Sequence, residues 1–236
     1  LIWMINASEG NPCLYALATA TVMIVKRVRL ADAENVDWEE IAQDESFVYV
    51  GDFGNNDGSR QDLRIYKISK SDLDDTLAVP EIIQFSYPDQ TDYTPALYNT
   101  PFDCEAMISA GDSLQLFTKN WTGGDTYIYK VPAVQGNYVA VLCGSLKING
   151  QVTASTYSDA NHCLYLLGYY NFIPFLCLLP DFVPGEDYKG SIQQISFPEN
   201  FGTQTEGIAL PDKREILISC EKGYGEPTIF KAAQCE

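Results

Sequence analysis

A short motif followed by a β-strand pattern recurs along this chain at a period of about 50 residues. Residues 35–42 precede the strand pattern 47–52, and residues 103–108 precede the strand pattern 114–119. Each copy holds short segments rich in β-branched and aromatic residues, separated by Gly, Asn and Asp. Four strands repeated at this period are typical of a propeller blade. The sequence therefore predicts an all-β fold, a β-propeller.

Five copies of the repeat can be counted, which predicts about five four-stranded blades in a single domain over residues 1–236. The N-terminal copy is partial, and we expect its blade to lack the innermost strand. Because Leu1–Ile5 already reads as mid-strand, we expect an upstream strand outside this numbering. A sixth blade would need further N-terminal residues. A two-sheet sandwich is the alternative fold, but sandwiches do not repeat a first-strand motif.

Composition excludes some classes of partner. Hydrophobic residues make up 46% of the chain, enough for a substantial core, and the formal net charge is −17. This charge argues against nucleic acid and anionic membranes, which need clustered Lys and Arg. No apolar run is long enough for a membrane-spanning helix, and no signal peptide is visible. A cationic ligand, a divalent metal or simple solubility would each account for the acidity.

The chain has seven cysteines and one histidine. The cysteines form no C-x-x-C pair, and the histidine cannot complete a zinc site with them at the usual spacing. Most lie in apolar strand patterns, where a free thiol behaves as a small core residue. We expect mostly buried thiols, with room for one disulfide, among Cys13, Cys104, Cys143, Cys163, Cys177, Cys220 and Cys235.

Propeller topology sorts the polar residues into faces. The first strand of each blade lines the central channel, so residues at its start and at the end of the second strand meet at one end of the channel. The first set contains Glu39, Glu105, Thr153 and Glu206, and the second contains Asp52, Lys119, Tyr169 and Glu221. With neighbouring residues, the predicted binding face comprises Asp37, Glu39, Asp52, Asn55, Arg60, Asp103, Glu105, Lys119, Tyr169, Glu206 and Glu221.

Three interpretations of the repeated carboxylates compete. Oxygen ligands from several blades suit Ca²⁺ or Mg²⁺. Alternatively, the carboxylates accept hydrogen bonds from backbone amides and so hold neighbouring blades together. A catalytic acid and base pair is the third interpretation, since crowded carboxylates shift each other's pKa. The candidate metal ligands are Glu39, Asp52, Glu105 and Glu206.

Two further features belong to this face. The Gly- and Asn-rich loop 51–60 lacks the acidic spacing of an EF-hand and is interpreted as a tight turn beside the ligand face. Trp38, Trp121, Tyr169 and Tyr170 flank the face, where aromatic rings either bind a sugar or peptide or pack between blades. His162 falls in a first-to-second strand turn and hence at the opposite end, which argues against a histidine-dependent hydrolase on the carboxylate ring.

The motifs in 35–42 and 50–56, with 103–106, 117–121 and 205–209, resemble a group of secreted bacterial β-propellers. These are mostly uncharacterised and are similar to the esterase-like-phytase and SdiA-regulated propeller families. The sequence departs from the pattern at Ala7, where the resemblance implies Asp. One Lys and one Arg on the face are few for a highly phosphorylated substrate, so phytase activity is not implied. The resemblance implies calcium bound through Asp37, Glu39, Asp52, Glu105 and Glu206.

The sequence thus leads to two functional hypotheses. The first is an extracytoplasmic propeller, periplasmic, cell-surface or secreted, that binds a small molecule, a glycan or a protein through its acidic face, with Ca²⁺ as the one expected cofactor. The second is a metal-dependent hydrolase of phosphoesters or other esters on the same face. We expect a monomer.

Overall fold

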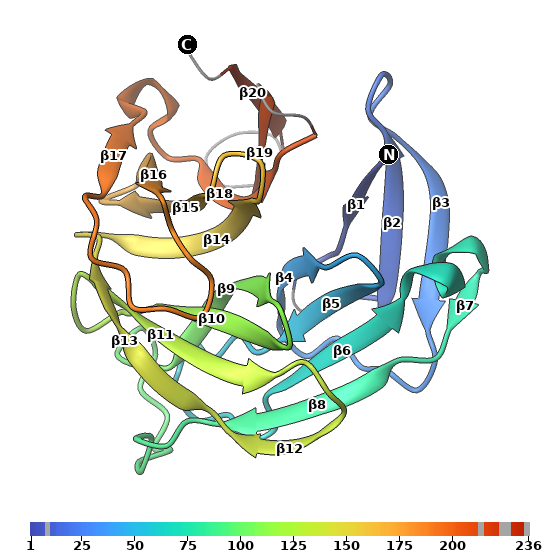
Figure 1. The fold of residues 1–236 in the computed structure, drawn as a ribbon, viewed down its shortest axis with the longest axis horizontal. Coiled ribbons are helices and arrows are strands. Elements are labelled where there is room, and N and C mark those ends of the chain that lie inside the picture. Colours follow the sequence, from blue (N-terminus) through green and yellow to red (C-terminus); the bar gives the residue numbers. More distant parts are fainter. Residues whose placement is uncertain (8–9, 212–214, 222–227, 234–236) are drawn as a thin grey trace.

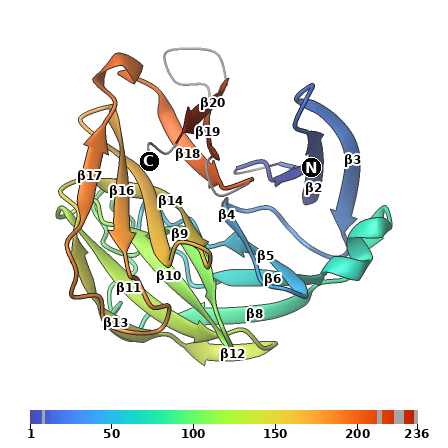
Figure 2. The same cartoon turned by 45° about the horizontal axis from the view of Figure 1, so that its top comes forward.

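A computed structural model describes residues 1–7, 10–211, 215–221 and 228–233 of the chain. These residues form five small sheets that stand around a central channel as the blades of a β-propeller (Figures 1 and 2). Neighbouring strands within each blade are antiparallel, apart from two short parallel additions at outer edges. The predicted all-β fold with five blades is confirmed.

The five blades follow one another in chain order, with the strand nearest the channel given first for each blade. They contain β1 (Ile2–Met4), β2 (Cys13–Ala18) and β3 (Met23–Leu30); β4 (Trp38–Gln43), β5 (Phe47–Asp52), β6 (Arg64–Ser69) and β8 (Glu81–Ser86); β9 (Asp103–Ala110), β10 (Ser113–Lys119), β11 (Asp125–Pro132) and β13 (Val141–Lys147); β14 (Gln151–Ser158), β15 (Cys163–Tyr170), β16 (Ile173–Pro180) and β17 (Gln193–Ser196); and β18 (Gln204–Ala209), β19 (Glu215–Glu221) and β20 (Thr228–Ala233).

The second strands of the middle blades are covered on both faces. Every residue of β10 is buried, and so is every residue of β15 except Tyr170. Blades packed on either side remove both faces of such a strand from water, and the sequence accordingly reads as a nearly continuous apolar run. The rigid centre of each blade therefore fixes the inner strand that lines the channel.

Four inner strands carry a bulge at the same point. The ladder skips one residue between Trp38 and Glu40 in β4, and the equivalent skips occur in β9, β14 and β18. A bulge leaves one residue out of the ladder and re-aims its side chain. The skipped residues are those predicted to start the first strands, namely Glu39, Glu105, Thr153 and Glu206.

The strands of the first blade take the second, third and fourth positions of a blade. Two short strands pair in parallel with the outer edge of the preceding blade. β7 (Leu77–Ala78) pairs with β3, and β12 (Gly136–Val139) pairs with β8. Because β8 is the fourth strand of its blade, β3 takes the fourth position in the first blade. Counting inward, β1 takes the second position, so among the described residues no strand takes the innermost one. The single-domain assignment over 1–236 stays a prediction.

Cysteines contribute to the core as free thiols. The described cysteines are all unpaired; Cys143 is partly buried and the other five are buried. The prediction of mostly buried thiols is confirmed, and Cys235 lies outside the described residues. Helical structure among the described residues is confined to the 3₁₀ turns η1 (Lys70–Asp74) and η2 (Pro198–Asn200). None of these turns is long or apolar enough to cross a membrane.

Truncation of a buried strand residue tests the packing between blades. Leu166 of β15 is fully buried in the core between the third and fourth blades, whereas Leu142 of β13 is 45% exposed. We expect Leu166→Ala to lower the free energy of unfolding by about 2–5 kcal/mol, because it leaves a cavity. Leu142→Ala should cost far less. Equal losses for the two variants in urea unfolding would contradict this packing.

Candidate functional site: carboxylates at one end of the channel

The bulged glutamates meet at one end of the channel. Burial raises the pKa of Glu39 well above its usual value, and the negative charge of Glu105 raises it further. Asp37, Asp103 and Glu206 act on the same group in the same direction. Carboxylates from three blades are thus close enough to oppose each other's ionisation. The predicted convergence of these residues is present in the structure.

One of these carboxylates is neutralised. Lys119 Nζ, at the end of β10, lies 2.9 Å from Glu105 Oε1, and both side chains are buried. Burial alone would lower the pKa of Lys119, but the charges of Glu105, Tyr169 and Asp103 hold it well above its usual value. The same ammonium lies 4.9 Å from the ring centroid of Trp121 and 5.4 Å from that of Tyr169. A lysine thus occupies part of the acidic end and remains charged.

Two other glutamates form no ion pair among the described residues. Glu206 accepts a hydrogen bond from Gln204 Nε2 at 2.9 Å, and burial together with the charge of exposed Glu221 raises its pKa to about 7. Glu39 forms no ion pair within the described part of the chain. A Cβ at Gly54 would overlap the carboxylates of both Glu39 and Asp37, so the absent side chain lets them approach. The charge of Lys119 lowers the pKa of Glu206, but burial and Glu221 outweigh it, so no ion pair holds either glutamate ionised.

Two other predicted site residues, Asp52 and Asp103, accept hydrogen bonds from backbone amides. Asp103 Oδ1, in the third blade, accepts a hydrogen bond from the backbone amide of Asn55 in the second blade at 2.6 Å. Its Oδ2 accepts one from Trp121 Nε1 at 2.7 Å. Asp52 is fully buried and accepts a hydrogen bond from the amide of Asp37 at 3.0 Å. The capping interpretation thus describes Asp103, whose bond joins two blades, whereas Asp52 bonds to an amide of its own blade.

The loop 51–60 is a tightly bonded turn. Arg60 donates to the carbonyl of Gly54 at 2.9 Å and pairs with Asp52 at 3.1 Å. Asn55 is buried, and its Oδ1 accepts a hydrogen bond from the Arg60 amide at 2.9 Å. Arg60 and Asn55 are therefore used within the loop. The sequence interpretation of a well-formed turn describes this segment better than their assignment to the binding face.

Sequence reasoning assigned no role to Glu40, yet this residue spans the channel. Its Oε2 accepts a hydrogen bond from the amide of Ser155 in β14 at 2.8 Å, and its Oε1 accepts one from the amide of Ile41. Burial raises the pKa of Glu40 to about 8. In the structure Trp38, Glu40 and Ala42 are the buried residues of β4, but the sequence does not distinguish Glu40 from its neighbour Glu39. Glu40 joins the inner strands of the second and fourth blades.

The four candidate metal ligands do not fit one Ca²⁺ site in this arrangement. Asp52 is paired with Arg60 and with Arg64, whose Nε lies 3.6 Å from it, and Glu105 is paired with Lys119. Within the described ranges, no group of three or more His, Cys, Asp or Glu side chains is arranged to hold a metal ion. Calcium needs six to eight free oxygen ligands.

Aromatic rings border the acidic end on the loops that open there. Trp38 is instead a core residue, fully buried and 5.7 Å from the Tyr66 ring. Trp121 is partly buried and stacks on exposed Tyr98, with ring centroids 4.5 Å apart. Tyr170 is also exposed, and Phe172 and Phe201 form an exposed pair at 6.4 Å. We call these residues, Trp121, Tyr98, Tyr170, Phe172 and Phe201, the aromatic rim.

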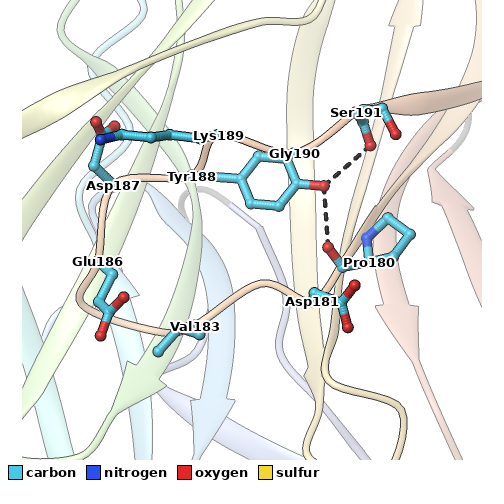
Figure 3. Close-up of a pocket in the computed structure, with 9 residues that line it drawn as sticks. All are labelled: Pro180, Asp181, Val183, Glu186, Asp187, Tyr188, Lys189, Gly190 and Ser191. Atoms are coloured by element: carbon cyan, nitrogen blue, oxygen red, sulfur yellow. Dashed lines mark hydrogen bonds between the residues drawn. The ribbon is translucent and has the colours of Figure 1, made fainter.

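The opposite end holds His162 and a separate cavity. His162 lies in the turn between β14 and β15, at the far end of the ladder from Gln151 and Tyr169, as predicted. Nearby, the loop 180–191 encloses a cavity of about 300 Å³ (Figure 3). The Tyr188 hydroxyl lies within hydrogen-bond distance of the carbonyl oxygens of Pro180 and Ser191. This cavity is distant from the carboxylates and shares none of their residues.

The raised pKa values predict how stability depends on pH. A carboxyl group with a pKa near 7 in the folded state and near its usual value when unfolded binds more protons when folded. The stability that this group contributes is therefore fully present at low pH, and this contribution is lost as the pH rises from about 5 to about 8. For Glu206 we expect a contribution of roughly 2–3 kcal/mol to this loss. Glu206→Gln should flatten the dependence in urea titrations, whereas Glu186→Gln, in the exposed loop at the opposite end, should leave it unchanged.

Removing Lys119 leaves a buried carboxylate alone. We expect Lys119→Met to destabilise the protein by about 3–5 kcal/mol at about pH 8, because Glu105 loses its partner. The loss should be smaller at about pH 5, where protonation neutralises Glu105. Exposed Lys147→Met is the control and should change little at either pH. A pH-independent loss in Lys119→Met would contradict the buried ion pair.

Comparisons with known proteins add little to this geometry. No protein-family model matches the chain, and no curated protein matches it. Among solved structures, the chain is similar to one in the crystal structure of the mitotic checkpoint complex, with a TM-score of 0.43 and 10% sequence identity, over 95% of this chain and 70% of that one. A likeness at this level carries no functional argument. The assignment of a five-bladed propeller rests on the sheets and their strand order.

Proposed function

We propose that this propeller is a binding protein that takes a cationic group of a ligand or partner at the acidic end of its channel. The observation that carries the proposal is the pair Glu39 and Glu206, which line one cavity and form no ion pair among the described residues. Burying carboxylates without compensation is costly, and a positive group would offset that cost. Lys119 neutralises Glu105 in the same way inside the protein.

The aromatic rim supports a ligand that combines charge with apolar surface. Exposed aromatic rings on the loops beside a carboxylate cluster can stack on a ligand and can attract cations through their faces. The Trp121 ring already contacts the Lys119 ammonium in this manner. A small molecule, a glycan or a protein segment with a positive group would each match this chemistry. The extracytoplasmic location remains part of the proposal through the family resemblance.

Hydrolase activity is the second candidate. Acid and base catalysis uses pairs of carboxyl groups whose pKa values are made different by burial and by neighbouring charges. Glu206, whose pKa is raised to about 7, and Glu39, whose pKa is raised by burial and by the charge of Glu105, make such a pair. Turnover of generic phosphate and acyl esters that is lost in Glu39→Gln and Glu206→Gln would favour this candidate. An unchanged rate in both variants would remove it.

A simple dication tests the binding proposal. We expect putrescine to bind the protein in isothermal titration calorimetry and to raise its melting temperature by mass action. Glu39→Gln and Glu206→Gln should each weaken binding about tenfold or more, and Glu186→Gln, at the opposite end, should not. Equal affinities in all variants would contradict the proposed site.

Calcium provides a separate arm of the same experiment. If Ca²⁺ shifts the melting temperature by several degrees and a chelator reverses the shift, the acidic end binds the metal despite the ion pairs at Asp52 and Glu105. If Ca²⁺ has no effect and putrescine does, the site selects an organic cation.

Cation binding at this site should release protons. Because burial raises the pKa of Glu206 to about 7, this group is partly protonated near neutral pH, and a cation binds its ionised form. The pKa of Glu39 is raised as well, so its ionisation responds to a cation in the same direction. We expect putrescine affinity to rise as the pH increases from about 6 to about 8. The calorimetric enthalpy should also depend on the ionisation heat of the buffer. An affinity that is flat over this range would show that these carboxylates do not bind the cation.

A further inference from the structure

Two residues of the aromatic rim have a backbone conformation that is unfavourable for them. The φ angle is 55° at Tyr98 and 63° at Phe172. Bulky side chains rarely adopt this left-handed region, because their Cβ approaches the following carbonyl oxygen too closely. Apart from Val22, the other non-glycine residues with positive φ in the described ranges are Asn, Asp and His, which tolerate it better. Strain at two exposed aromatic residues on one face points to a role for their side chains.

Phe172 occupies a turn position for which glycine is favoured. Asn171 and Phe172 form the whole turn between β15 and β16, since Tyr170 and Ile173 on either side are paired. Both turn residues have positive φ, and Asn-Gly is the usual sequence for such a hairpin. Phe172 is 58% exposed, so more than half of its surface faces solvent instead of the core. The fold itself therefore gains little from having phenylalanine at this position.

Tyr98 is held in place by an unusually long connection. Residues 87–102 link β8 to β9, and this is the longest connection between blades in the described chain. The Tyr98 amide donates to the carbonyl of Asn56 at 2.8 Å, which ties the connection to the loop beneath it. The exposed Tyr98 ring then stacks on Trp121. Long connections without regular structure are usually functional, and this one presents its aromatic ring in a fixed position.

The side chains of the rim suit a protein better than a glycan. Phe172 and Phe201 have no polar group, and the Trp121 Nε1 hydrogen is already donated to Asp103. The rim therefore offers few of the hydrogen bonds by which sugar hydroxyl groups are oriented. Exposed Phe, Tyr and Trp side chains are enriched at interfaces between proteins, where they pack against apolar groups. A polypeptide supplies such groups from its own side chains.

The charge beside the rim defines the partner further. Exposed Glu221 and the half-buried Glu206 lie at the same end of the channel, and the whole chain has a net charge of −17. Complementarity requires positive charge on the partner. A second copy of this chain would bring the same carboxylates to the contact, and like charges would oppose that pairing. The observations thus favour a different, basic polypeptide.

We propose that the aromatic rim is the docking surface for another protein, in which a segment presents a Lys or Arg flanked by apolar side chains. The basic group lies at the carboxylates of the proposed cation site, and the apolar neighbours pack on the rim. Lys119 shows the same combination within this chain, because its ammonium pairs with Glu105 and contacts the Trp121 ring. This inference rests on the proposed function and specifies its partner.

A random peptide library tests the chemistry of the partner. We expect the 236-residue protein to select, from displayed random peptides of about twelve residues, sequences in which a Lys or Arg is flanked by apolar residues. A selected peptide should bind Glu206→Gln at least about tenfold more weakly than the unchanged protein, and Glu186→Gln equally well. No enrichment over an empty support, or selected sequences without a basic residue, would overturn the proposal.

Phe172→Gly separates recognition from folding. Glycine adopts positive φ without a steric clash, so the midpoint of urea unfolding should not fall, whereas affinity for the selected peptide should drop about tenfold or more. Val22→Gly is the matched control, since Val22 also has positive φ and lies in the hairpin between β2 and β3, at the opposite end of the channel. It should leave the affinity unchanged. A lower midpoint with full affinity in Phe172→Gly would show that the ring serves the fold, and the proposal would fail.

Other occupants of the rim give different results. If a glucosamine tetramer binds in a Phe172-dependent manner and no peptide does, the rim binds a cationic glycan and the proposal fails. Concentration-dependent dimerisation that is lost in Phe172→Gly would assign the rim to a second copy instead.

Putrescine separates this inference from the proposed function. If putrescine binds in a Glu206-dependent manner and no peptide is selected, the cation site stands and the docking surface fails. If neither putrescine nor any peptide binds, the proposed function itself fails.

Discussion

The β-bulge repeated in the inner strands is the constraint on which the charged end of this channel depends. An inner strand of a propeller faces neighbouring inner strands across a narrow space, where carboxylates are costly to bury. At the bulge one residue leaves the ladder, and Glu39, Glu105 and Glu206 occupy that position in three blades while Thr153 occupies it in a fourth. Thr153 donates a hydrogen bond to the carbonyl of Thr205 in the next blade. The residue at the bulge is thus either a glutamate or a threonine that bonds to the next blade.

The acidic residues divide into two groups with different physical roles. Asp52, Asp103 and Glu40 accept hydrogen bonds from backbone amides, and each of these bonds satisfies a buried or partly buried donor. These residues fix the geometry of the channel. Glu39 and Glu206 have no comparable set of donors, and burial together with neighbouring carboxylates raises their pKa values. A positive group placed beside them would favour their ionised forms, which is the physical basis of the proposed cation site.

Much of the fold could be predicted because a propeller is a repeat. The period and the position of the motif before each first strand were sufficient to predict five blades, and strand order placed the carboxylates opposite His162. The ion pairs and hydrogen bonds made by the buried carboxylates could not be predicted in the same way. Arg64, 12 residues from Asp52 in the sequence, reaches it only because β5 and β6 pair in that register. Glu40 needs a partner 115 residues away in β14, which no local pattern encodes.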